Sequence, residues 1–259
     1  MTKENHCAFL ELPQRVKPRR EGMTSFFDYF LPHAEVKNLV EVAAPAIDWA
    51  KLIHIGLTTN LPENWLEKKL SLYRAHGIRT YPGGIPYQMA LVQDKVEQYF
   101  DWLVECGFDG VEIAEDAMSS VMTQEKRGEF IKMAVDRGLE VHTELGKKDP
   151  EAPMDLKEAY ESIQFDLQCG VSHCVIERSE LEPYLALSDV GPLLEFVERI
   201  GLENLLFEPG PFGWPHVHRW CFQTFGKKVN LGNITKDEIL YVEWSRIGLS
   251  RFVNFDYFQ

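Results

Sequence analysis

"TQEKRGEFIKMAVDRGLEVHTELG", Thr123 to Gly146, contains both kinds of segment from which the fold can be predicted. Its first part has the apolar spacing of an amphipathic helix, starts with a threonine suited to cap that helix, and ends at Gly138. Its second part, residues 139–146, is short and carries β-branched residues, as a buried strand does. A helix followed by a strand is the unit that parallel α/β folds repeat.

The same unit recurs along the chain. Seven further strand-like runs occupy residues 23–30, 51–56, 78–84, 110–115, 173–178, 205–210 and 228–233. Segments of helical period lie between them or after the last one, at residues 62–77, 87–107, 155–170, 188–201 and 234–248. Eight strands that alternate with helices predict an α/β fold of the (β/α)8 TIM barrel type.

A doubly wound open sheet is the alternative to the barrel. That fold usually has a glycine-rich phosphate loop after its first strand, and the chain reads "DYFLPHAE" there. We therefore predict one barrel domain over residues 22–259, with an aromatic C-terminal tail, preceded by an N-terminal extension of residues 1–21. The tail "RFVNFDYFQ" is too apolar for a free end and is expected to pack on the barrel or on a second subunit, which suggests a homo-oligomer.

Composition excludes several classes of function. The net charge of −13 argues against a broad surface for nucleic acid or anionic membrane. No stretch approaches the ~20 apolar residues of a membrane helix, and the five cysteines show no C-x-x-C spacing, which favours a reducing cytoplasm. The basic run "QRVKPRR", residues 14–20, is interpreted as a solvated entry segment rather than a phosphate-contact patch.

Acidic residues end four consecutive strand-like runs. In a barrel the loops after the strand C-termini build the active site, so these side chains should meet at one rim. Crowded carboxylates raise one another's pKa unless a cation shares the site, and a hard ion such as Mg²⁺ relieves that repulsion. We predict metal ligands among Glu112, Glu144, Glu177 and Glu208. A structural ring of salt bridges with Lys147, Lys148, Arg178 or Arg79 remains the alternative.

Other polar residues fall near the same rim. Lys147 follows the fifth run and is predicted to act with Glu144 in catalysis, by supplying charge or a proton to a small anionic substrate. The residues predicted to contact that substrate are Asp28, His54, Lys148, Arg178 and Asn230. "YPGG", residues 81–84, is either a tight turn or a place where backbone amides approach an anion.

At these residues the sequence resembles the phosphosulfolactate synthase (ComA-like) family, from about Gly22 to Gly248. The shared pieces, in order, are "YPGG", "CGFDGVEI", "TELGKK", "FDLQCG", "VIER", "FEPG" and "VNLGNITKDEI". Each motif alone is ordinary, and their order and spacing together are specific.

The resemblance implies a (β/α)8 barrel that adds sulfite to phosphoenolpyruvate with Mg²⁺, a lyase of coenzyme M biosynthesis. It also implies a lysine directly after the first-strand aspartate and one in the second strand, where this chain has Tyr29 and His54. This loss of positive charge suggests a diverged member, acting on a related carboxylate or with another nucleophile. Two alternatives remain open: a metal-dependent sugar isomerase or epimerase, and a stress-associated barrel without catalysis.

Overall fold

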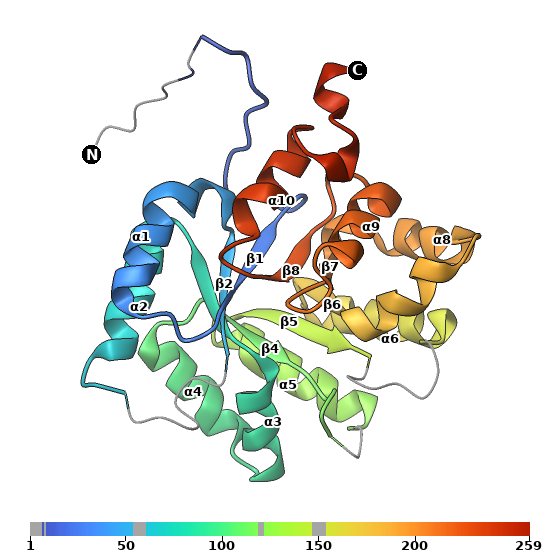
Figure 1. The fold of residues 1–259 in the computed structure, drawn as a ribbon. Helices are drawn as coiled ribbons and strands as arrows, with labels where there is room; N and C mark the ends of the chain where they lie inside the picture. The colour runs from blue at the N-terminus through green and yellow to red at the C-terminus, as the bar shows by residue number, and fades with distance from the viewer. Residues whose placement is uncertain (1–6, 8, 54–60, 119–121, 147–153) are drawn as a thin grey trace.

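The structure, a computed structural model, describes residues 7, 9–53, 61–118, 122–146 and 154–259. Eight parallel strands form one sheet with the order β3-β2-β1-β8-β7-β6-β5-β4, and helices surround it (Figure 1). The strands are β1 (Thr24–Asp28), β2 (Trp49–Leu52), β3 (Arg79–Pro82), β4 (Gly110–Ile113), β5 (Glu140–Leu145), β6 (His173–Glu177), β7 (Leu205–Glu208) and β8 (Leu231–Ile234).

The two ends of that strand order, β3 and β4, meet and nearly close the sheet into a barrel. The backbone N–H of Asp109, one residue before β4, donates to the carbonyl of Thr80 at 2.9 Å. The backbone N–H of Thr80 donates to Asp109 Oδ2 at 2.8 Å. The predicted (β/α)8 TIM barrel is therefore confirmed.

Helices connect successive strands and cover the outside of the barrel (Figure 1). They are α1 (His33–Ala43), α2 (Trp65–Arg74), α3 (Gly84–Val92), α4 (Val96–Cys106), α5 (Gln124–Asp136), α6 (Leu156–Cys169), α7 (Arg178–Leu181), α8 (Gly191–Ile200), α9 (His216–Phe225) and α10 (Ile239–Arg246). Thr123 caps α5 by accepting from the backbone N–H of Lys126 at 3.3 Å, as its sequence predicts.

Three differences between the predicted and the observed elements bear on the site. The single helix predicted over residues 87–107 is wrong: it is two helices, because Asp94 takes a φ of 54° and Lys95 N–H donates back to Ala90 O at 2.8 Å. Strand β2 begins at Trp49 and β8 begins at Leu231, not at residues 51 and 228. The two shifted strand starts decide which side chains reach the C-terminal end of the barrel, where the active site is expected.

Polar side chains fasten the N-terminal ends of the strands. Asp48 accepts from Arg19 Nε at 2.9 Å and from the backbone N–H of Thr24 at 2.9 Å. Arg15, also in the predicted N-terminal extension, pairs with Glu243 of α10 at 2.6 Å. Most of the basic run thus contacts the barrel and does not lie free in solvent.

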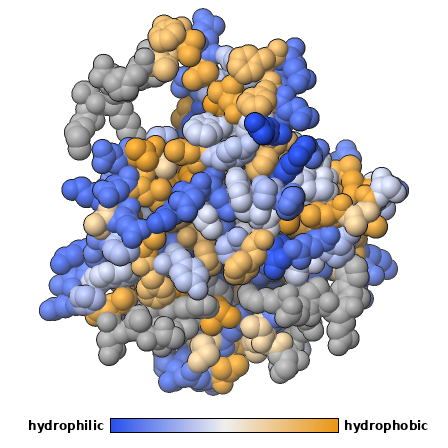
Figure 2. All heavy atoms as spheres, viewed as in Figure 1, coloured by the Kyte–Doolittle hydropathy of each residue, from blue (hydrophilic) through white to orange (hydrophobic). Residues whose placement is uncertain are grey.

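The C-terminal tail packs only partly on the barrel. Phe252 is buried against Trp214 and Tyr241, whereas Phe258 is 73% exposed. Figure 1 places the C-terminal tail at the upper end of the molecule, where the N-terminal segment also lies, and Figure 2 shows apolar and polar atoms mixed there. The packing predicted for the tail therefore holds for Phe252. Among the helices of the described residues, none has the length and apolar content needed to cross a bilayer.

Candidate active site and metal centre

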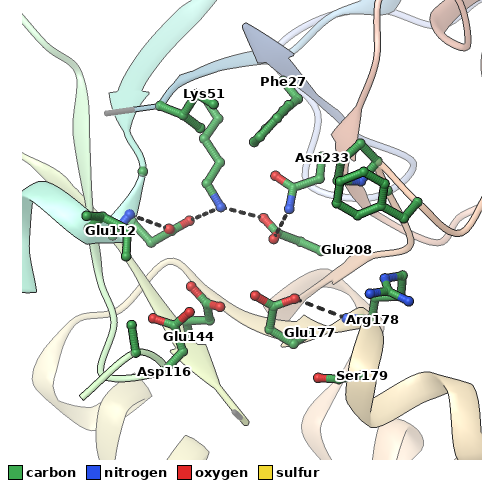
Figure 3. Close-up of a pocket in the computed structure, with 18 of the residues that line it drawn as sticks. Phe27, Lys51, Glu112, Asp116, Glu144, Glu177, Arg178, Ser179, Glu208 and Asn233 are labelled. Atoms are coloured by element: carbon green, nitrogen blue, oxygen red, sulfur yellow. Dashed lines mark hydrogen bonds and ion pairs between the residues drawn. The ribbon is translucent and has the colours of Figure 1, made fainter. Parts of the chain in front are cut away.

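A cavity of about 440 Å³ opens at the C-terminal ends of the strands (Figure 3). Its described charged lining residues are Lys51, Glu112, Asp116, Glu144, Glu177, Arg178 and Glu208. These described residues carry five carboxyl groups and two cationic side chains, an excess of acid that a purely structural ring of ion pairs among them would not need.

Lys51 of β2 lies between two of the predicted glutamates (Figure 3). Its Nζ is 2.8 Å from Glu112 Oε2 and 2.9 Å from Glu208 Oε1. All three residues are at least 90% buried. Glu112 also accepts the backbone N–H of Gly84 at 2.7 Å, and Glu208 accepts a hydrogen bond from the Asn233 side chain.

The glycine at position 84 is required by this arrangement. A Cβ there would lie 2.5 Å from Ala114 Cβ and 3.1 Å from Glu112 Oε1. Of the two interpretations of "YPGG", the approach of a backbone amide to an anion is thus realised, and the anion is the protein's own carboxylate.

The ionisation of this trio is strongly perturbed. Burial would lower the pKa of Lys51, but Glu112 and Glu208 together outweigh burial and raise that pKa well above its usual value. Burial raises the pKa of Glu208 to about 8, although Lys51 opposes the shift. The trio therefore holds a lysine that stays charged and, in Glu208, a carboxyl group that keeps its proton to unusually high pH.

Three other carboxyl groups gather beside the trio. Asp116, Glu144 and Glu177 each offer an oxygen, and these oxygens all lie within 4.8 Å of one another. Burial raises the pKa of Glu144 well above its usual value, and Glu177 and Glu112 add to the shift. Asp116 is held by Gln88 Nε2, 2.5 Å from its Oδ1, and Glu177 accepts the backbone N–H of Arg178 at 3.3 Å (Figure 3).

This acidic triad fits a metal ion. Glu144 Oε1 is buried and accepts no hydrogen bond from any residue that the structure describes. A divalent cation would compensate the clustered charge and give that oxygen a partner, and all three donors are hard oxygen ligands of the kind that Mg²⁺ prefers. Of the four predicted ligands, Glu144 and Glu177 belong to this triad, whereas Glu112 and Glu208 pair with Lys51, a cation that the salt-bridge alternative did not name.

Two residues predicted to contact substrate lie away from the cavity. Asp28 is buried at the end of β1, where its Oδ2 accepts from Lys69 at 2.7 Å and from the Tyr73 hydroxyl at 2.6 Å. Asn230 precedes β8, and its side-chain amide donates to backbone carbonyls such as that of Leu205 at 3.0 Å. Its predicted place at the barrel mouth is wrong, because β8 begins after it.

Of the remaining predicted residues, one lies at the cavity and three are not among the residues that the structure describes. Arg178 lines the cavity and forms an ion pair with Glu182. His54, Lys147 and Lys148 lie outside the described residues. Their predicted roles stay predictions.

Lys51, Asp116 and Asn233 line the cavity and were not predicted from the sequence. The predicted strand began at Lys51, although the residues around it, "DWAKLI" (48–53), read as one buried run. Lys51 is the third residue of β2, and its long side chain reaches the cavity. It supplies a second-strand lysine, so the loss of that charge inferred from His54 is wrong.

Comparison with known proteins now decides the family. The family model of (2R)-phospho-3-sulfolactate synthase (ComA) matches residues 13–251. The chain belongs to the phosphosulfolactate synthase family. It is 31% identical over 253 residues to "Phosphosulfolactate synthase" of Methanothermobacter thermautotrophicus, covering 95% of this chain and 96% of the relative. The Bacillus subtilis protein of the same name is 28% identical, with 93% and 95% covered.

Solved structures agree on the barrel alone. The YdjI aldolase of Escherichia coli superposes with a TM-score of 0.55 at 12% identity, covering 90% of this chain and 89% of that one. Membership of the phosphosulfolactate synthase family supports an enzyme of the lyase or synthase type with a small-molecule substrate. In this family member the cavity with its acidic triad is the candidate active site.

Proposed function

We propose that this protein catalyses the Mg²⁺-dependent addition of sulfite to phosphoenolpyruvate. One observation carries the proposal: the acidic triad of Asp116, Glu144 and Glu177 shares a cavity with a buried lysine in a phosphosulfolactate synthase family member. Both co-substrates are anionic, and a cavity lined mainly by carboxylates needs a cation before it can take them.

The chemistry proposed has two steps. The sulfur lone pair of sulfite attacks the methylene carbon of phosphoenolpyruvate and forms the carbon–sulfur bond. The π electrons of the C=C bond move onto the carboxylate, and the resulting aci-carboxylate is then protonated at the adjacent carbon. When bound by the triad, Mg²⁺ would supply a Lewis acid that stabilises the negative charge on the carboxylate oxygens.

The side chains of the chain have separate tasks in this proposal. Lys51, charged because Glu112 and Glu208 raise its pKa, provides a fixed positive charge beside the developing aci-carboxylate. Arg178 at the start of α7 is placed to contact a phosphate or sulfonate group. Lys147, predicted from the sequence, delivers the proton to the adjacent carbon, and Lys148 adds positive charge nearby.

The test is an assay of phosphoenolpyruvate and sulfite consumption with purified protein. Turnover should require Mg²⁺ or Mn²⁺ and should stop with EDTA. Glu144→Gln should lower kcat/KM by at least about 100-fold, because it removes a charged ligand. Glu105→Gln, an exposed carboxylate on α4, is the matched control. Activity that persists in EDTA, or that Glu144→Gln leaves unchanged, would show the proposal to be wrong.

A further inference from the structure

A second cavity lies at the opposite end of the barrel. It has a volume of about 620 Å³ and is lined at its polar positions by Arg19, Arg20, Arg79, Glu140, Ser172, His173, Glu203 and Asn204. Several of these residues begin strands: Arg79 begins β3, Glu140 begins β5 and His173 begins β6. Among the residues that the structure describes, it shares no lining residue with the candidate active site.

The three arginines of this cavity differ in whether their side chains already form ion pairs or hydrogen bonds within the protein. Arg19 is paired with Asp48, and Arg79 is paired with Glu140 Oε1 at 2.6 Å while it stacks on the Trp49 ring at 4.0 Å. Arg20 has no ion pair or side-chain hydrogen bond with a described residue. Its backbone is nevertheless fixed, because its carbonyl accepts from Asn230 Nδ2 at 3.0 Å.

A buried histidine forms the floor of the cavity. His173 is only 7% exposed, and its Nδ1 has no hydrogen-bond partner among the described residues. Its ring stacks on that of His142 at 5.4 Å, and both nitrogens of His142 are likewise buried without a partner. Buried polar atoms without a partner are rare in folded proteins, and His173, which carries one, is also a lining residue of the cavity.

We propose that this cavity is a binding site for a phosphate-type oxyanion, with Arg20 as the charged contact and His173 and Ser172 as hydrogen-bond donors from the floor. The described lining carries three arginines against two glutamates, in a chain whose net charge is −13. Arginine suits a tetrahedral oxyanion because its planar fork donates two parallel hydrogen bonds.

The charges that face the site set which anion it takes. Burial, with Arg79 and Arg20 adding to it, lowers the pKa of His173 to about 4, so at neutral pH the ring donates through one N–H and carries no charge. Glu140 is already paired with Arg79, and Glu203 is a second carboxylate on the wall. These carboxylates disfavour a large polyanion and favour a single phosphate group, free or carried on a small molecule.

The test follows the imidazole NMR signals of His173 while inorganic phosphate or glycerol phosphate is added at constant ionic strength. A saturable shift is expected with at least one of them. The measurement is repeated in Glu144→Gln protein without metal, so that binding at the catalytic end does not contribute. Tighter binding of glycerol phosphate identifies a phosphorylated small molecule as the ligand, and equal affinity identifies the free ion; both outcomes support the site.

Arg20→Gln provides the decisive comparison, because Arg20 is exposed and its loss should not impair folding. The change should weaken binding by about tenfold or more, since a charge-assisted contact is lost. Arg219→Gln removes the same charge from an exposed position on α9 outside the cavity and should leave binding unchanged. Absence of a saturable shift with either anion, or equal affinities of the two variants, would overturn the proposal.

Discussion

Two buried lysines pair with strand-end carboxylates at the C-terminal end of the barrel, and their surroundings differ. Lys69 of α2 pairs with Asp28 of β1 at 2.7 Å and donates to the carbonyl of Leu31 at 2.6 Å. Lys51 of β2 pairs with both Glu112 and Glu208. The first cluster has one carboxylate for one lysine, whereas the second has two and lies beside a further acidic triad.

The difference separates a structural ion pair from a functional one. Both Asp28 oxygens are occupied by the protein itself, by Lys69 and Tyr73 on one side and by the backbone N–H of Leu31 at 2.8 Å on the other. None of these groups lines the candidate active site. The Lys51 cluster instead lines the cavity, with two carboxyl groups for one lysine.

The largest effect is expected from Lys51→Met. If Lys51 stabilises negative charge on the reacting carboxylate, kcat/KM for phosphoenolpyruvate and sulfite should fall by about 100- to 1000-fold. The folded fraction is measured by circular dichroism in the same samples, because removal of the lysine also leaves two buried carboxyl groups without their cation. A Lys51→Met protein that is folded and fully active would remove the distinction between the two clusters.

Lys69→Met should affect stability and not turnover. The change leaves the Asp28 carboxylate buried without its cation, so the free energy of unfolding should fall by about 3–5 kcal/mol in urea titrations. kcat/KM per folded molecule should stay at the wild-type value. The double variant Lys69→Met with Asp28→Asn should recover part of the loss, since it removes the unpaired charge. A loss of activity beyond the unfolded fraction would assign Lys69 to the active site.

The pH dependence of stability should also distinguish the clusters. Glu208, with its pKa raised from 4.5 to about 8, holds its proton in the folded state over a range in which the unfolded chain has lost it. Stability in EDTA should therefore fall as pH rises from about 4.5 to about 8, with Glu208 contributing up to about 5 kcal/mol. Glu208→Gln should flatten this slope, while the exposed control Glu105→Gln should keep it. An unchanged slope in Glu208→Gln would place the perturbed proton elsewhere.

The same two clusters show what could be predicted from the sequence. The barrel followed from local signals: apolar period, helix caps such as Thr123, and glycines such as Gly107 and Gly170 that end helices with positive φ. Glu144 and Glu177 followed from their place at strand ends, because parallel strands end at one rim. These inferences need only the order of elements along the chain.

Other assignments depended on strand bounds and helix rotation, which are set by contacts distant in sequence. The pairing of Trp49 with Arg79 fixes where β2 begins and hence where Lys51 points. Because β8 starts at Leu231, Asn230 lies at the N-terminal end of that strand and not at the barrel mouth. Asp28 does end a strand as predicted, but α2 turns Lys69 and Tyr73, four residues apart, onto its carboxylate.

The smallest effect is expected from Tyr73→Phe, which changes the Asp28 cluster by one hydroxyl group. Burial and the neighbouring Asp28 raise the pKa of Tyr73 well above its usual value, so its hydroxyl stays protonated and donates to Asp28 Oδ2. Loss of that bond to a buried carboxylate that keeps Lys69 should cost about 1–2 kcal/mol in urea unfolding, with unchanged kcat/KM. Tyr73 does not line the candidate active site. A fall in kcat/KM in this variant would therefore mean that the two clusters are coupled through β1 and β2. The purely structural role assigned to Asp28 would then be wrong.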